Sequence, residues 1–267
     1  MKLLKLRRKK TILALLIEYE QKTSIMIFDH TSQKEIVSYS VPDDLTLGGN
    51  FPYLSWSYDA IWLAFTQCAY DQYGYICQIF LWDVSSGTEP VKLNSLVGGL
   101  DDTLDTSAPV WSSKDYRLAF IQEVWRSNTN VYIVDFQQSP PELFDLELLS
   151  NLGLLWSPDS SQLLVDGMMA PFVVDIEPKT KTMLFNGGYG IYYFIGWLPD
   201  GRSIYHTIAP YFGTGRILFF DPVLSDPRFS PSDFINDVSK HSPNLSFSTN
   251  EIVFVGIYDP TVSHPWD

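Results

Sequence analysis

Few residues of this chain are of types that carry out catalysis, and they do not gather in the sequence. The four histidines, His30, His206, His241 and His264, fall in unrelated places. The chain has no G-x-S-x-G nucleophile turn, no H-E-x-x-H zinc motif and no Walker loop. We therefore expect no catalytic residue, no metal site and no cofactor, and we predict that the protein is not an enzyme.

Five aspartates recur at a regular spacing, each at the end of an apolar segment. The segments are SIMIFD, QIFLWD, NVYIVD, PFVVD and RILFFD, and they end at Asp29, Asp83, Asp135, Asp175 and Asp221. A carboxylate at the end of a strand can accept backbone N–H groups of the next turn. We interpret this set as turn residues rather than as an acid–base pair.

A tryptophan motif recurs in step with these aspartates. Its copies are LSWSYDAIWLAF (54–65), PVWSSKDYRLAF (109–120), LLWSPDSSQLLV (154–165), GWLPDGRSIYH (196–206) and the weaker LSFSTNEIVFVG (245–256). The anchors are Trp56, Trp111, Trp156, Trp197 and Phe247. Two independent markers that share one period indicate a repeat protein.

A period of about 40–50 residues with several short strands is typical of a β-propeller blade. We predict an all-β propeller of four-stranded antiparallel blades. In the blade at 53–95 the expected strands are YLSWS, AIWLAFTQ, QIFLWD and PVKLNS. The tryptophans should fill the space between blades, and Asp59, Asp159 and Asp200 should sit in turns.

The motifs WSPDSSQLL, WLPDGRSIY and DTSAPVWSSKDYRLAFIQ resemble the repeat of TolB-like, WD-type propellers. The same repeat is similar to that of the propeller in prolyl oligopeptidase-type enzymes. The resemblance spans nearly the whole chain and implies the fold. It implies a periplasmic or extracellular setting, but no specific partner.

The whole chain, 1–267, is predicted to be a single domain. Residues 1–10 form a basic tail or a first strand, LLKL, and 258–267 form a C-terminal tail. We favour five blades, with NLSFS (244–248) completing the N-terminal blade. The alternative is six blades, the last of which is incomplete.

The two cysteines, Cys68 and Cys77, flank the segment AYDQYGYI. If the two strands pair as a hairpin, the thiols could face each other, and a disulfide would imply an oxidising compartment. Free, buried thiols are the favoured interpretation, and a zinc site is the weakest.

In a propeller, the loops that join the second strand of a blade to the third and those between blades emerge on one face, which we call the loop-rich face. The candidate ligand-binding residues there are aromatic: Tyr70, Tyr73, Trp125, Tyr192, Tyr193 and Tyr211. We expect the acidic residues of the loop before Trp111, namely Asp101, Asp102 and Asp105, to be solvated rather than to bind calcium.

The net charge is −13, although the first ten residues hold six of the 18 basic ones. Such an acidic body makes nucleic acid an unfavourable ligand. No segment has the length of a membrane span, and the apolar run TILALLI stops at Glu18 without a cleavage site for export.

These observations favour a non-catalytic propeller that binds a protein or peptide through the loop-rich face. One alternative is the regulatory propeller of a larger hydrolase of the prolyl oligopeptidase type, and another is a glycan-binding propeller.

Overall fold

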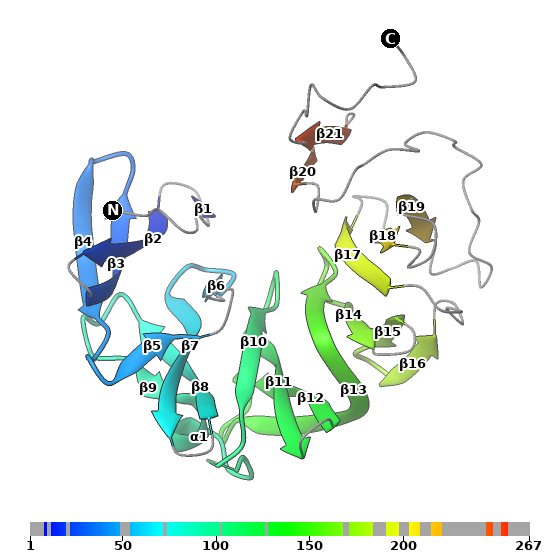
Figure 1. The fold of residues 1–267 in the computed structure, drawn as a ribbon, viewed down its shortest axis with the longest axis horizontal. Helices are drawn as coiled ribbons and strands as arrows, with labels where there is room; N and C mark the ends of the chain where they lie inside the picture. Colours follow the sequence, from blue (N-terminus) through cyan, green and yellow to red (C-terminus); the bar gives the residue numbers. More distant parts are fainter. Residues whose placement is uncertain are drawn as a thin grey trace. The chain divides into compact units, whose positions relative to one another are not determined.

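The computed structural model describes residues 8–9, 12–19, 22–48, 54–71, 74–101, 103–125, 128–167, 171–183, 191–197, 203–208, 215–220, 244–247 and 252–255. The chain divides into two compact units, Met1–Met168 with Val174–Thr180, and Met169–Val173 with Lys181–Asp267. Nearly all of the described elements are antiparallel strands (Figure 1).

The first sheet has four strands in the order β1-β2-β3-β4. They are β1 (Arg8–Lys9), β2 (Ile12–Tyr19), β3 (Lys22–Asp29) and β4 (Lys34–Ser40). Buried Ile25 and Ile27 alternate with less buried residues on β3, as a strand with one core-facing side requires. The LLKL segment that was expected as a first strand lies outside the described residues.

The second sheet corresponds to the predicted blade at 53–95. Its strands are β5 (Leu45–Leu47), β6 (Leu54–Trp56), β7 (Trp62–Asp71), β8 (Gly74–Asp83) and β9 (Val91–Lys92). Both β5 and β6 pair with the inner edge of β7, and β8 and β9 follow on the other side. The expected last strand, PVKLNS, is shorter than predicted because a single helical turn, α1 (Leu93–Leu96), follows β9.

The next sheet has seven strands in chain order, from β10 to β16. They are β10 (Thr106–Trp111), β11 (Arg117–Trp125), β12 (Asn128–Asp135), β13 (Glu142–Trp156), β14 (Gln162–Gly167), β15 (Pro171–Asp175) and β16 (Thr180–Met183). Two predicted blades are joined here because β13 is 15 residues long and pairs first with β12 and then with β14. We call them the third blade (β10 to the first half of β13) and the fourth blade (the second half of β13 to β16).

The remaining strands belong to the second unit. A three-stranded sheet holds β17 (Ile191–Trp197), β18 (Ser203–Ile208) and β19 (Gly215–Phe220), and β20 (Asn244–Phe247) pairs with β21 (Ile252–Val255). These match the strands expected from the fourth and fifth motif copies. The blade count, the joining of residues 244–248 to the N-terminal blade, and the single domain stay predictions.

The core of the first unit lies between successive sheets. Trp56 packs in a cluster with Leu16 and Ile25 of the first sheet, and Trp111 packs with Leu81 of the second sheet. The indole of Trp156 donates a 2.9 Å hydrogen bond to the carbonyl of Val110 in the blade before it. The prediction that these rings fill the space between blades is confirmed for the first unit.

Three of the recurrent aspartates, Asp29, Asp83 and Asp135, have the predicted turn role. Thr31, Ser85 and Gln137 each donate their backbone N–H to the carboxylate of the aspartate two residues earlier, at 2.8–2.9 Å. Asp175 differs, because it binds the side chains of Gln162 and Thr180. The equivalent prediction for Asp200 and Asp221 concerns residues outside the described part of the chain.

Candidate functional site

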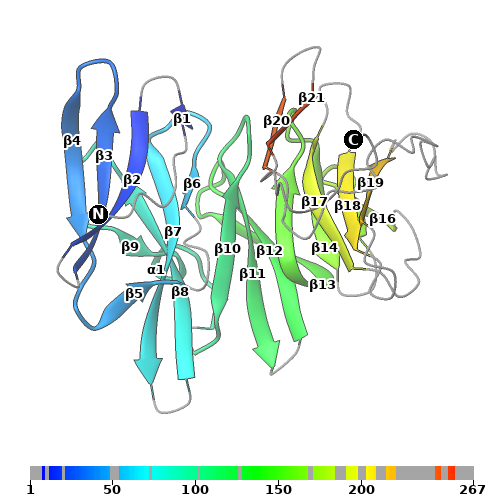
Figure 2. The same cartoon turned by 45° about the horizontal axis from the view of Figure 1, so that its top comes forward.

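Two long hairpins extend on the same side of the first unit (Figure 2). In the β7–β8 hairpin the strand pairs continue as far as Asp71 and Gly74, so that only residues 72 and 73 connect the strands. The β11–β12 hairpin continues to Trp125 and Asn128. The ends of these two hairpins, together with the described residues of the loop at 97–105 that precedes β10, form the described part of the predicted loop-rich face.

The predicted aromatic residues occupy this region only in part. Tyr70 lies opposite Tyr75 near the end of the β7–β8 hairpin, and Trp125 ends β11. The side chains of both, and the whole of Tyr73 and Tyr211, lie outside the described residues.

The expected loop position of Tyr192 and Tyr193 is wrong. Both residues lie within β17, where they pair with Thr207 and His206 of β18. The run IYYFI consists of β-branched and aromatic residues, which favour a strand over the glycine-rich loop before it. Their backbone is described, but their side chains are not.

The favoured interpretation of the cysteines as free thiols is also wrong. Cys68 and Cys77 are direct partners across β7 and β8, and they form a disulfide. The two-residue connection fixes the register of the hairpin, and this register places the two cysteines opposite each other. The disulfide links the strands three pairs below the end of the hairpin.

The inner edge of this hairpin is covered by β5. Leu45, Thr46 and Leu47 pair with Ala69, Cys68 and Gln67. Gly48 follows directly, and a Cβ atom at this position would lie 2.7 Å from the Cys68 sulfur and 2.8 Å from the Thr66 methyl group. Only glycine fits here without a shift of the hairpin, because real Cβ atoms do not approach other atoms so closely.

The outer edge is covered by side chains rather than by a strand. β9 pairs with β8 only at Phe80 and Leu81. Beyond that point the Asp105 carboxylate accepts the backbone N–H of Cys77, and the Thr106 hydroxyl accepts the N–H of Ile79 at 3.0 Å. Two backbone donors that would otherwise lack a partner are thereby satisfied.

The loop before β10 is itself fixed to both neighbouring sheets. The Gln78 amide donates to the carbonyl of Leu104 at 2.8 Å, and the Gln122 amide donates to that of Asp101 at 3.2 Å. The carbonyl of Asp105 also accepts the N–H of Glu123. The loop is therefore held in one position by the second and third blades.

The expectation of solvated acids holds for Asp101 and is wrong for Asp105. Asp101 is exposed, and the hydroxyl and N–H of Thr103 lower the pKa of its carboxyl. Asp105 is half-buried, and burial raises its pKa against the smaller lowering by the Cys77 N–H. Asp102 lies outside the described residues. Among the residues that the structure describes, no group of three potential ligands could hold a metal ion.

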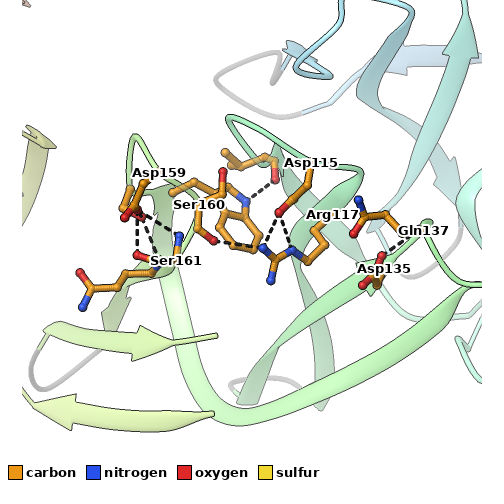
Figure 3. A network of polar contacts seen from close by, with 11 residues as sticks. Asp115, Arg117, Asp135, Gln137, Asp159, Ser160 and Ser161 are labelled. Atoms are coloured by element: carbon orange, nitrogen blue, oxygen red, sulfur yellow. Dashed lines mark hydrogen bonds and ion pairs between the residues drawn. The ribbon is translucent and has the colours of Figure 1, made fainter. Parts of the chain in front are cut away.

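A second polar site, which the sequence did not indicate, lies at the other end of the same strands, where β11 begins (Figure 3). Arg117 forms an ion pair with Asp115 and donates to the carbonyl of Ser160 at 3.2 Å. Its guanidinium lies 5.5 Å from the ring centre of Trp156. Burial lowers the pKa of Arg117, but the hydrogen bond and charge of Asp115 outweigh this and leave it raised.

A small cleft adjoins Arg117. Its apolar part is formed by Ile133, Leu146 and Val174, among others. Lys179 lies at this cleft, and its ammonium is 3.7 Å from the ring centre of Phe144. Asp135 and Glu177 also line the cleft, so that acidic and basic groups are balanced there.

No family model matches the chain, and a search of curated proteins found no match. Solved structures do match. A structure from a study of two prolyl endopeptidases and of inter-domain dynamics in their catalysis aligns over 91% of this chain and 37% of its own, with a TM-score of 0.61 and 16% identity. The chain has a β-propeller fold.

Two further structures are similar to this propeller. Dihydro-heme d1 dehydrogenase NirN, in complex with DHE, aligns over 92% of this chain and 52% of its own, with a TM-score of 0.57 and 12% identity. TolB from Acinetobacter baumannii aligns over 79% of this chain and 52% of its own, with a TM-score of 0.42 and 14% identity. The propeller thus spans about a third to a half of the solved chains that it matches.

The predicted resemblance to the propeller of prolyl oligopeptidase-type enzymes is confirmed for the fold. Identities of 16% or less show the fold alone. The helix that the structure describes, α1, has four residues and is far too short to cross a membrane.

Proposed function

We propose that this propeller is a non-catalytic module that binds a protein or peptide through its loop-rich face, with the end of the β7–β8 hairpin as an anchor. The observation that carries the proposal is the support of this hairpin. A disulfide joins its strands, β5 covers one edge, and Asp105 and Thr106 cover the other.

Such support is what a binding element needs. The segment beyond the disulfide contains Tyr70, Tyr73 and Tyr75, and tyrosine is enriched among residues that contribute most to protein interfaces. A hairpin that is ordered before binding loses less conformational entropy when the partner binds. Disulfides persist in oxidising compartments, so the partner is to be sought in such a compartment.

A quantitative pull-down tests the proposal. Immobilised wild-type protein is compared with Tyr70→Ala/Tyr73→Ala, and bound proteins are identified by mass spectrometry and then titrated by calorimetry. We expect the double variant to lose a partner that the wild type retains.

The matched control is Tyr58→Ala/Tyr116→Ala, which removes two tyrosines that contact each other in the turns at the other end of the sheets. It should retain the partner after thermal unfolding has shown that it is folded. Equal affinities of the wild type and the Tyr70→Ala/Tyr73→Ala variant for every partner would exclude the hairpin as the anchor.

One observation supports a second candidate. The alignment covers 91% of this chain but only 37% of the prolyl endopeptidase chain, so the propeller corresponds to one part of that larger protein. In this alternative it is the regulatory propeller of a hydrolase. Sequencing the DNA beyond codon 267 separates the two: an in-frame G-x-S-x-G segment supports the hydrolase, and a stop codon supports the separate binding module.

A further inference from the structure

Among the contacts of the described residues, few besides strand pairing hold the part of the β7–β8 hairpin beyond the disulfide. We call residues 69–76 the hairpin tip. It contains three strand pairs, which join Ala69 to Ile76, Tyr70 to Tyr75, and Asp71 to Gly74. Of these residues only Ala69 pairs with β5, and the contacts of Asp105 and Thr106 stop at Cys77. In the part of the chain that the structure describes, the tip is otherwise a two-stranded ladder, and such ladders are marginally stable in water.

The two cysteines differ in exposure. Cys68 is 1% exposed and lies directly under Gly48. Cys77 is half-buried. We therefore place the attack of a reductant at Cys77, the more exposed of the two cysteines.

The other hairpin of the loop-rich face has no such link. Cys68 and Cys77 are the two cysteines of the chain, so the β11–β12 hairpin cannot be joined in this way. Its register also shifts between Glu123 and Trp125. The disulfide is therefore specific to the hairpin that carries the three tyrosines.

We propose that the Cys68–Cys77 disulfide is a redox switch for the hairpin tip. Reduction by a dithiol releases the tip from its fixed register and leaves the sheets folded. The consequence for binding rests on the function proposed above, because it requires that the tip is the anchor for a partner.

The reaction is a thiol–disulfide exchange in two steps. A thiolate of the dithiol attacks the Cys77 sulfur, the bond between the cysteines breaks, and its electron pair leaves on the Cys68 sulfur, which takes up a proton. The second thiol of the reductant then displaces the Cys77 sulfur, which also ends as a thiol. The dithiol is oxidised to its own disulfide, and the two cysteines are reduced.

The sheets remain folded because the contacts below the disulfide do not depend on it. Leu63, Phe65 and Trp82 are buried in or beside β7 and β8, at most 1% exposed. The six strand pairs from Trp62 to Gln67 remain, and so does the bond from Gln78 to Leu104.

Hydrogen exchange followed by mass spectrometry tests the switch on the purified chain, with and without dithiothreitol. A maleimide reagent counts the thiols. We expect reduction under native conditions to accelerate exchange at residues 69–76 by about tenfold and to leave β2 and β3 unchanged.

Cys68→Ala/Cys77→Ala should show the faster exchange without reductant and should not respond to dithiothreitol. Three results would overturn the proposal: tip exchange that changes by less than about twofold after complete reduction, thiols that appear only in denaturant, or faster exchange throughout the sheets. No partner is needed for this measurement. Its failure is therefore distinct from failure of the proposed function, which the tyrosine variants test separately.

Discussion

The turn that follows the recurrent tryptophan occurs three times in the described part of the first unit, and one copy is built differently from the other two. In the turns that follow Trp56 and Trp156, a serine hydroxyl donates to the aspartate two residues later at 2.6 Å. The same hydroxyl accepts a backbone N–H five residues later, from Trp62 or Gln162, at 2.9–3.0 Å. Each of these turns is closed by its own side chains.

In the turn after Trp111, Lys114 stands where the others have aspartate. The Ser112 hydroxyl is buried and has no hydrogen-bond partner in this described turn. The nearby acid, Asp115, is one position later and binds Arg117 instead. This turn therefore lacks the serine–aspartate closure of its counterparts, although the backbone N–H of Ser112 still donates to the carbonyl of Arg117.

This turn instead contacts both the preceding turn and the following blade. Tyr116 donates a hydrogen bond to Asp59 in the preceding turn, and the Asp59 carboxylate raises the pKa of the Tyr116 hydroxyl. Arg117 reaches Ser160 and Trp156 in the following blade. One copy of a repeat can thus lose the side-chain hydrogen bonds of its turn and contact the blades on both sides instead.

Removal of the contacts that Arg117 makes between blades should have the largest effect on the free energy of unfolding. Arg117→Ala leaves the partly buried Asp115 without its cation and removes the contact with Trp156. We expect the free energy of unfolding to fall by about 3 kcal/mol, as for other buried ion pairs that lose one partner. Urea unfolding followed by tryptophan fluorescence measures this.

Arg117→Lys is the control, since it keeps the charge but cannot form the two-pronged bond to Asp115. It should lie between the wild type and the alanine variant. A loss of less than about 1 kcal/mol in Arg117→Ala would mean that the link between the blades contributes little.

Alanine substitution of the turn serines Ser157 and Ser112 should change the free energy of unfolding in different ways. Ser157→Ala removes two hydrogen bonds and should lower the free energy of unfolding by about 1–2 kcal/mol. Ser112→Ala removes a buried hydroxyl without a partner and should be neutral or stabilising. Parallel urea titrations measure the difference. Equal losses in both variants would contradict the contrast between the turns.

Glycine should stabilise the two regular turns. Ala60 and Ser160 have positive φ angles of 64° and 66°. They occupy the position at which the fourth motif copy has Gly201. Ala60→Gly should raise the free energy of unfolding by about 0.5–1 kcal/mol, because relief of the left-handed strain exceeds the added chain entropy.

The control for this change is Ala69→Gly, at a strand position where glycine has no such advantage and should destabilise. Thermal unfolding compares the two variants. A lower melting temperature for Ala60→Gly would show that the left-handed turn is not strained.

The smallest effect concerns pH. The Ser157 hydroxyl and Ser161 lower the pKa of Asp159 to about 2, from an ordinary value of 3.8. Its contribution to stability is therefore present above the ordinary value and is lost as the pH falls through about 2. Asp159→Asn should flatten the pH dependence of the free energy of unfolding between these two pKa values. If the variant and the wild type show the same pH dependence, the lowered pKa of Asp159 is contradicted.

The strands and turns were predictable because their markers recur. An apolar segment that ends in aspartate was sufficient to place β3, β8, β12 and β15. The turn role of Asp59 and Asp159 followed from the same repetition. What repeats is the part of the chain that packs between sheets, and packing restricts the sequence at each copy.

The features of the candidate site were harder to predict because each occurs once. The disulfide depends on a register that is set by the two-residue connection, and a shift of one residue would place the cysteines on opposite faces. Asp105 is buried by the edge of β8, which lies 28 residues earlier in the chain. Tyr192 was predicted to lie in a loop because glycines precede it. In the structure the loop ends before this residue.

The long strand β13 limits how the sequence can change over evolution. Repeat proteins gain and lose blades by duplication and deletion, and these events need a connecting loop that tolerates new lengths. Between the third and fourth blades the chain offers a shared strand instead. An inserted residue within either regularly paired half of β13 would turn the core-facing side chains beyond it toward solvent. These two blades are therefore expected to be inherited as a pair, whereas insertions should accumulate in loops elsewhere.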